Sequence, residues 1–114
     1  MDRRHRLASS SDFARVRRSG KSYAHPLVVL VASPSELPCV RIGFSAGKAV
    51  GGAVERNRAK RRLREALRIV LPTLRPGWDL VLIARPALVS AEWKMVVDAV
   101  DGLLRKARLT DRDD

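Results

Sequence analysis

The feature that most restricts the fold of this chain is one long amphipathic helix, predicted over residues 53–71. Within it, apolar residues recur three and four positions apart and share one arc of the helix surface. They are Ala59, Leu63, Ala66, Leu67 and Val70. Such an arc is wide enough to dock on a sheet, and Pro72 with the Pro76-Gly77 turn ends the helix. We therefore expect a sheet built from the segments on either side.

Three apolar segments predict the strands of that sheet. The segment LVVLVA at 27–32 has the composition of a buried strand, and so does WDLVLIA at 78–84. The segment CVRIGFSA at 39–46 shows the partial alternation of a strand with one buried face. Residues 36–38 are predicted to form a hairpin loop between the first two strands in the chain.

Two further helices are predicted near the ends of the chain. Ser10 or Ser11 is a suitable N-cap for a helix that stops at Gly20, and Ser90 is a suitable N-cap for a last helix. We expect both Trp78 and Trp93 to fill the core. Core spacing in the last helix is shown by Trp93, Val96, Val97, Val100, Leu103 and Leu104.

The predicted elements follow the order helix, two or three strands, basic helix, strand, helix, and with a third strand before the basic helix the order is α-β-β-β-α-β-α. This order predicts an α+β fold, a two-layer α/β sandwich in which helices pack on one mixed sheet of about four strands. A length of 114 residues suits one domain, which we place at residues 1–109. Residues 110–114, TDRDD, are predicted to be a disordered tail.

The positive charge of the chain is concentrated in two short segments. Twenty-three Lys and Arg against 12 Asp and Glu give a net charge of +11. Residues 1–25 have a net charge of +5 and residues 56–68 one of +6, while the remainder is neutral overall. Two basic surfaces on so small a domain indicate a polyanionic partner, and they exclude an ordinary neutral metabolic enzyme as the first interpretation.

The second basic segment lies within the long predicted helix. Six cations fall in the nine residues 56–64, with no acid among them, although like charges one turn apart destabilise a helix. A separate arc of the helix is shared by Asn57, Arg61, Arg64 and Arg68. Arginine suits bidentate phosphate binding and stacking on bases. The pattern therefore favours nucleic-acid binding over a merely solvated face.

Several other classes of protein are disfavoured. The single cysteine, Cys39, has no partner for a disulfide or a cysteine zinc site, and we expect a core thiol in a reducing compartment. No apolar stretch reaches the ~20 residues of a membrane span, and no signal-peptide pattern follows the first basic residues. The chain is therefore expected to be cytoplasmic, with no membrane partner.

The sequence offers no clear set of catalytic residues. The glycines of 43–52 match neither a Walker A loop nor GxGxxG, and Gly47, Gly51 and Gly52 are instead expected to form a strand-to-helix turn. Asp12, Glu36, Glu55 and Asp79 are isolated in sequence. His5, in an N-terminal segment that we expect to be mobile, and His25 remain the one candidate acid and base pair of a protein-only nuclease.

The chain resembles the protein subunit of bacterial ribonuclease P, and the likeness covers nearly the whole chain. The matching segments are LASSSDFARVRRSGKS, RIGFSAGKAVGGAVERNRAKRRLREALR and WDLVLIARP. The most specific motif is R-N-R-x-K-R-x-x-R, which occupies residues 56–64. The resemblance implies a left-handed β-α-β crossover around this helix, an exception to the right-handed rule that holds in about 98% of cases.

The resemblance also implies a function. In that family the protein is an accessory subunit of an endoribonuclease whose catalytic RNA, with bound Mg²⁺, removes the 5′ leader from precursor tRNA. The protein is expected to bind the catalytic RNA and the leader, to contain no catalytic residues, to bind no metal by itself and to need no protein partner. The alternative is a general or ribosome-associated RNA-binding protein with no role in tRNA processing.

The implied site residues form two sets. For the leader cleft they are Phe13, Arg17 and Lys48. Family members often have an aromatic residue in place of Arg17 and of Leu30, a serine in place of Gly47 and a lysine in place of Ala49, so we expect the cleft to depend less on stacking and more on charge. For the catalytic RNA they are Arg56, Asn57, Arg58, Lys60, Arg61 and Arg64, to which the helical arc adds Arg68.

Overall fold

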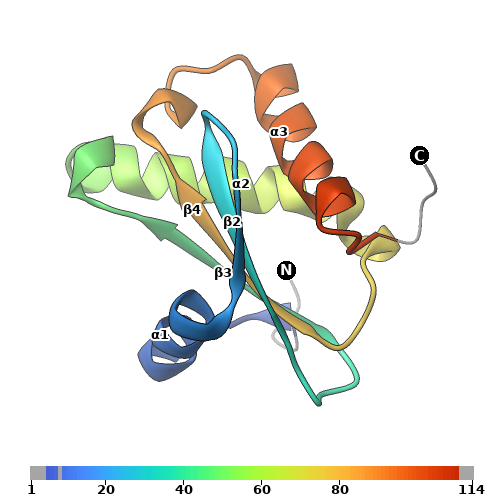
Figure 1. Cartoon of the computed structure of the whole chain (residues 1–114). Helices are drawn as coiled ribbons and strands as arrows, with labels where there is room; N and C mark the ends of the chain where they lie inside the picture. The colour runs from blue at the N-terminus through green and yellow to red at the C-terminus, as the bar shows by residue number, and fades with distance from the viewer. Residues whose placement is uncertain (1–4, 8, 111–114) are drawn as a thin grey trace.

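The computed structural model describes residues 5–7 and 9–110 and contains one four-stranded sheet with helices on both faces (Figure 1). The predicted order of elements is confirmed. The elements are α1 (Ser10–Ser19), β1 (Lys21–Ala24), β2 (Val28–Pro34), β3 (Val40–Ala46), α2 (Ala53–Val70), β4 (Trp78–Ala84) and α3 (Trp93–Lys106). The described residues also include the short 3-10 helices η2 (Lys48–Val50), η3 (Leu71–Thr73) and η4 (Pro86–Leu88).

The strands lie in the order β1-β2-β4-β3. Strand β2 is antiparallel to both β1 and β4, whereas β3 is parallel to β4. The prediction of a hairpin at 36–38 is wrong, because β4 lies between β2 and β3. The physical reason is that Leu80, Val81 and Leu82 are all fully buried, so β4 is apolar on both faces and takes a central position in the sheet.

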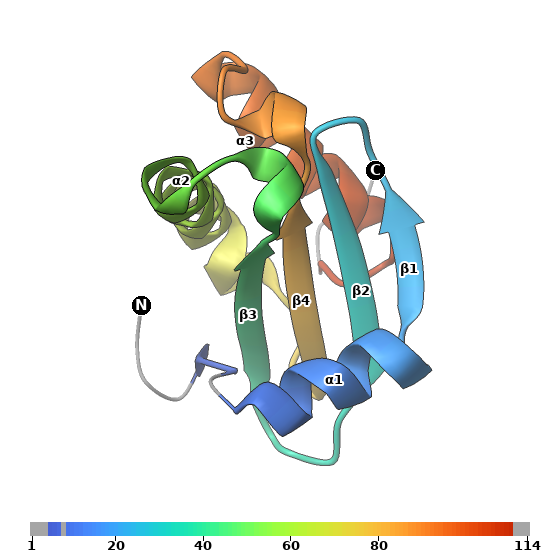
Figure 2. The same ribbon diagram turned by 90° about the vertical axis from the view of Figure 1, so that its left-hand side faces the viewer.

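The connection from β3 through α2 to β4 is left-handed. In Figure 2, α1 lies in front of the sheet, both strands point upward and β4 stands to the right of β3. Helix α2 packs on the far face, so the chain advances to the left when it is viewed from the helix side. The crossover implied by the family resemblance is therefore confirmed.

Helices α2 and α3 cover one face of the sheet and enclose the main core. All five residues of the predicted apolar arc of α2 are buried there. In α3, Val96, Val100, Leu103 and Leu104 are buried as predicted. Trp93 departs from the prediction, since its side chain is 43% exposed. The predicted N-cap is also wrong, because Glu92, not Ser90, is the N-cap and Trp93 is the first residue of α3, at the end of the helix.

Helix α1 lies across the opposite face, over a smaller core formed by Leu7, Val16, Val31 and Val81. Its N-cap is Ser9, one residue earlier than predicted, and the Ser9 hydroxyl accepts a hydrogen bond from the amide of Asp12 at 3.4 Å. The predicted end at Gly20 is confirmed. This position needs glycine, because a Cβ there would lie 2.5 Å from the Val16 carbonyl oxygen.

Both ends of the described chain are tied to the fold. The amide of Leu7 donates to the Ile42 carbonyl at 2.9 Å, and His5 Nδ1 lies 2.9 Å from the Val40 carbonyl oxygen. His5 is therefore anchored beside β3, and the expectation of a mobile segment is wrong at this residue. Thr110, assigned to the tail from sequence, is buried and pairs with Leu74. The rest of the predicted tail, 111–114, lies outside the described residues.

Candidate nucleic-acid interface

A glycine turn at the end of β3 sets the start of the basic helix. Gly51 has a φ of 143°, a conformation that side chains rarely adopt, and Gly52 is the N-cap of α2. Glu55 Oε1 accepts a hydrogen bond from the Gly52 amide at 2.8 Å, which satisfies one of the unpaired amides of the first turn. The turn predicted from Gly47, Gly51 and Gly52 is confirmed, with Gly47 capping η2.

The polar residues of α2 divide into groups that point in different directions. Asn57, Arg58 and Arg61 are exposed and line a shallow depression at the start of the helix, together with Val54. Arg68 lies farther along the exposed side and pairs with Glu65 at 3.4 Å, while Arg56 is half-buried. The first group forms what we call the outer surface, defined by Asn57, Arg58 and Arg61. It presents two cations and an amide to solvent.

Lys60 and Arg64 line a different pocket, where α2 faces the edge of the sheet. They line a groove of about 330 Å³ along β3, whose other walls include Phe13 of α1 and Phe44 of β3. The Arg64 guanidinium lies 5.5 Å from the centre of the Phe44 ring, the distance of a cation-π contact. We call this the edge groove, and Arg6, Leu7, Ile42 and Gly43 complete its lining.

The edge groove joins residues that the sequence placed in two separate sets. Lys60 and Arg64 were expected at the catalytic RNA and Phe13 at the leader, yet one groove contains all three. Arg17 and Lys48, both exposed, lie outside its lining. Arg6 was not predicted as part of a site. Its bridge to Ile42 beside β3 places it there, and no local pattern in the sequence reveals that pairing.

The Phe13 side chain rests directly on the sheet. A Cβ added at Gly43 would lie 2.3 Å from the Phe13 ring, so the ring occupies the space that any other residue at position 43 would fill. Phe13 is half-buried and packs beside Val16 and Val81. Beyond α1, the register places Val29, Ile83 and Ser45 in one row across the same face, and all three are half-buried. The aromatic ring thus borders a partly open strip of sheet.

Arg62, although part of the basic segment, has a structural role. Its guanidinium donates to the carbonyl oxygens of Leu88, Val89 (3.0 Å) and Ala91 (2.6 Å), and it lies over the Trp93 ring. These contacts bind the middle of α2 to the connection between β4 and α3. Arg62 is therefore the cation of this helix that is committed to the fold rather than to the surface.

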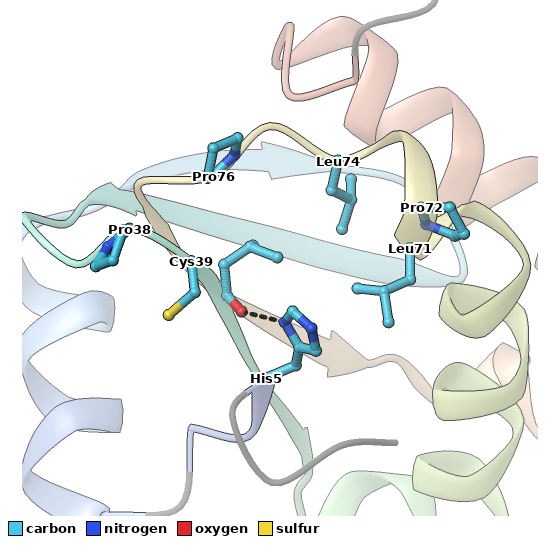
Figure 3. Close-up of a pocket in the computed structure, with 8 residues that line it drawn as sticks. His5, Pro38, Cys39, Leu71, Pro72, Leu74 and Pro76 are labelled. Atoms are coloured by element: carbon cyan, nitrogen blue, oxygen red, sulfur yellow. Dashed lines mark hydrogen bonds between the residues drawn. The ribbon is translucent and has the colours of Figure 1, made fainter.

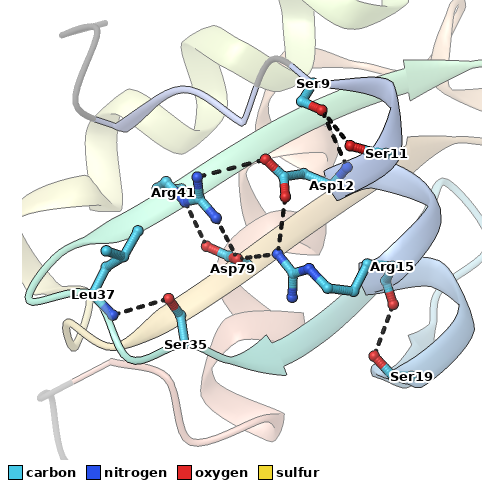
Figure 4. A network of polar contacts seen from close by, with 9 residues as sticks. All are labelled: Ser9, Ser11, Asp12, Arg15, Ser19, Ser35, Leu37, Arg41 and Asp79. Atoms are coloured by element: carbon cyan, nitrogen blue, oxygen red, sulfur yellow. Dashed lines mark hydrogen bonds and ion pairs between the residues drawn. The ribbon is translucent and has the colours of Figure 1, made fainter.

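The first basic segment is also partly neutralised. Figure 4 shows Arg15 of α1 and Arg41 of β3 converging on Asp79 of β4, whose carboxylate is only 1% exposed. Burial raises the pKa of Asp79, but hydrogen bonds from Arg41 and Arg15 outweigh it and leave the pKa below its usual value. Asp12 pairs with both arginines as well, at 3.5 and 3.6 Å. Arg15 therefore adds little net charge to the surface.

The lowered pKa of Asp79 predicts how folding stability depends on pH. Because the carboxyl has a lower pKa in the folded chain than in the unfolded chain, its contribution is complete above about pH 5 and is lost as the pH falls through the lowered pKa. We expect the free energy of unfolding of the wild-type protein to fall below about pH 4, and that of Asp79→Asn to fall less. Urea unfolding from pH 3 to 7 measures both, and parallel curves would contradict the assignment.

The two histidines are far apart and cannot act on one bond. His5 lines a pocket with Cys39, Leu71 and Pro72 at the start of β3 (Figure 3). His25 accepts a hydrogen bond from the Leu27 amide, beyond the other end of the sheet. The seven residues of β4 span that separation, about 20 Å. The interpretation as a histidine-dependent protein-only nuclease is therefore not supported.

Within residues 5–7 and 9–110, no group of three or more His, Cys, Asp or Glu side chains is placed to hold a metal ion. The two carboxylates that come together, Asp12 and Asp79, are both paired with arginine. Cys39 is half-buried rather than part of the core. In the same part of the chain, no helix has the length and hydropathy needed to cross a membrane.

Comparison with known proteins gives one consistent result at the level of sequence. The family model described as Ribonuclease P matches residues 1–108. The chain is 46% identical to the ribonuclease P protein component of Herpetosiphon aurantiacus, over 96% of this chain and 89% of that protein. It is 42% identical to the protein of the same name from Roseiflexus castenholzii, over 94% and 88% of the two chains.

Solved structures give the same result at the level of the fold. The RNase P protein of Staphylococcus aureus superposes with a TM-score of 0.83 and 26% sequence identity, covering 94% of this chain and 98% of that chain. The RNase P protein of Thermotoga maritima gives a TM-score of 0.77 and 27% identity, covering 88% and 96% of the two chains. The α+β fold with one mixed sheet is therefore shared with both.

Proposed function

Because the chain belongs to the ribonuclease P protein family and is a subunit of that holoenzyme, we propose that it binds the catalytic RNA and the 5′ leader of precursor tRNA. In this proposal the RNA cleaves the leader to give the mature 5′ end of the tRNA. The observation that supports it most strongly is the edge groove, where the aromatic Phe13 and the cations Lys60 and Arg64 meet beside the exposed outer surface.

The outer surface has the chemistry expected of a contact with a structured RNA. Arg58 and Arg61 are exposed on the same helix as Asn57, whose side-chain amide can both donate and accept hydrogen bonds. Guanidinium groups fixed on a helix bind phosphates with two parallel hydrogen bonds. We assign this surface to the catalytic RNA, together with Arg56 and Arg68 on the same helix.

The edge groove has the chemistry expected of a contact with a single strand. Single-stranded nucleic acids are held by aromatic rings on which bases stack, next to cations that follow the phosphates. Phe13 and Phe44 supply the rings, while Arg6, Lys60 and Arg64 supply the cations. We assign the leader to this groove and to the adjoining strip of sheet, with Arg17 and Lys48 as exposed cations near its path.

We place the chemistry of cleavage and its Mg²⁺ ions on the RNA. The donor set of the described residues does not suit a resident metal ion, because the carboxylates that come together are already neutralised by arginine. The role of the protein is then to bind and orient the substrate, and we assign it no catalytic residue. We place the holoenzyme in the cytoplasm, where a bacterial cell transcribes its precursor tRNA.

Selectivity for one RNA tests this proposal against general RNA binding. We expect the protein to bind transcribed ribonuclease P RNA from its own organism at least about tenfold more tightly than a ribosomal RNA fragment of equal length, a difference of about 1.4 kcal/mol. Filter binding at several salt concentrations measures this, because affinities for RNA are meaningful only at a stated ionic strength. Equal affinity for the two RNAs would instead support a general RNA-binding protein.

A further inference from the structure

Helix α1 depends on its tertiary contacts for its position. It has only ten residues, too few for a stable isolated helix, and just one of them, Val16, is fully buried. It nevertheless supplies Phe13 to the edge groove, and it carries Arg17 one turn farther along, outside the groove lining. Any shift of α1 relative to the sheet therefore moves the residues that we assign to the leader.

A closed ring of ion pairs links α1 to two strands. Asp79, on the central strand β4, accepts from Arg15 of α1 at 2.6 Å and from Arg41 of β3 at 2.9 and 2.8 Å, so both carboxylate oxygens are used. Arg41 also pairs with Asp12, which returns the ring to α1 (Figure 4). The Asp79 side chain, which joins the two arginines, is only 1% exposed. Salt therefore screens its ion pairs little.

The ring lies next to the point where Phe13 meets the sheet. Arg41 and Asp79 are directly paired in the register, and Gly43 follows Arg41 by two residues on the same face of β3. Asp12, the neighbour of Phe13 in α1, is itself part of the ring. The same contacts that hold α1 down therefore fix where the Phe13 ring rests on Gly43.

We propose that Asp79 is a positioning residue for the leader, because the ion pairs that it makes with Arg15 and Arg41 fix α1, and with it Phe13, at the edge groove. This inference rests on the proposed function. It assigns to a buried carboxylate an effect on substrate affinity that acts through the position of a helix rather than through contact with RNA.

The clean test removes the direct pair between α1 and Asp79 and leaves Asp79 paired with Arg41, which keeps its contact with Asp12. Arg15→Met does this, since Arg41 still holds both carboxylate oxygens and the Arg15 side chain is 38% exposed. Arg18→Met is the matched control, because it removes the same charge from an exposed position of the same helix. The holoenzyme with each variant is assayed on precursor tRNA with its leader and, for binding, on leaderless tRNA, well below the unfolding temperature.

The leader gain is the ratio of the holoenzyme's affinity for precursor tRNA to its affinity for leaderless tRNA. We expect Arg15→Met to reduce the leader gain about fivefold, within the range for residues that act through their neighbours. The reduction should appear in KM for the precursor, with kcat and affinity for the catalytic RNA unchanged, and Arg18→Met should retain the wild-type gain. The folded fraction of Asp79→Asn is measured by circular dichroism. We expect that fraction to show the same loss of leader affinity as Arg15→Met. A merely structural role would lower the unfolding temperature and leave the leader gain intact.

The possible failures are distinguishable. If the wild-type holoenzyme itself gains no affinity from the leader, the proposed function fails, and this inference fails with it. If the wild type shows the gain and Arg15→Met retains it in full, the proposed function stands and the positioning role of Asp79 is wrong. Equal losses in Arg15→Met and Arg18→Met would also overturn the inference, because lost charge would then explain both.

Discussion

Replacing Arg58 and Arg61 together with alanine is expected to weaken assembly with the catalytic RNA by about 30-fold. Both side chains lie on the outer surface, and each is expected to contribute roughly 1 kcal/mol through phosphate contacts. Two lost phosphate contacts should also reduce the slope of log affinity against log salt by about 1.5. Filter binding of the catalytic RNA from 50 to 300 mM salt measures both quantities.

A matched control separates local contact from net charge. Lys94→Ala with Lys106→Ala removes the same charge from exposed positions of a different helix, α3. We expect this variant to assemble with nearly wild-type affinity, since distant surface charges are screened at these salt concentrations. Equal weakening in the two double variants would mean that α2 makes no specific contact with the RNA.

Replacing Phe13 with alanine is expected to reduce affinity for leader-bearing precursor tRNA about tenfold and to leave binding of leaderless tRNA almost unchanged. A base stacked on an aromatic ring contributes about 1–3 kcal/mol, and Phe13 is the ring of the edge groove that α1 supplies. Fluorescence titration of the holoenzyme with the two substrates provides the comparison.

A second substitution at the same position distinguishes stacking from packing. Phe13→Leu retains an apolar side chain over Gly43 but removes the aromatic face, so it should stay closer to the wild type in folding stability than Phe13→Ala does. If stacking holds the leader, Phe13→Leu should lose leader affinity nearly as fully as Phe13→Ala. If each substitution weakened binding of leader-bearing and leaderless tRNA to the same extent, with the protein folded, Phe13 would not belong to the leader site.

The elements that the sequence predicted well are those defined by local periodicity. The buried arc of α2 and the bounds of β4 follow from patterns of neighbouring residues, and the structure confirms them. The order of the strands does not follow from such patterns, since an apolar segment does not specify which strand it pairs with. The left-handed crossover came from the family resemblance, because the general rule predicts the opposite hand.

The site shows the same division. Helical geometry distinguishes the outer cations from the buried arc, yet nothing local indicates that Arg62 turns to the carbonyl oxygens of residues 88–91 while Arg61 faces solvent. Asp79 stands alone in a strand sequence, and its two arginine partners are 38 and 64 positions away. Contacts over such distances in the chain are fixed by the topology of the sheet. This is why the sequence missed the ion-pair ring and the edge groove.

Cleavage of 5′-labelled precursor tRNA at low Mg²⁺ concentration shows whether the chain acts together with a catalytic RNA. Three reactions are compared: the catalytic RNA from the same organism alone, the RNA-free protein alone, and both together. We expect cleavage at the mature 5′ end only when both are present. Metal-dependent cleavage by the RNA-free protein, or no stimulation of the RNA by the folded protein, would contradict this expectation.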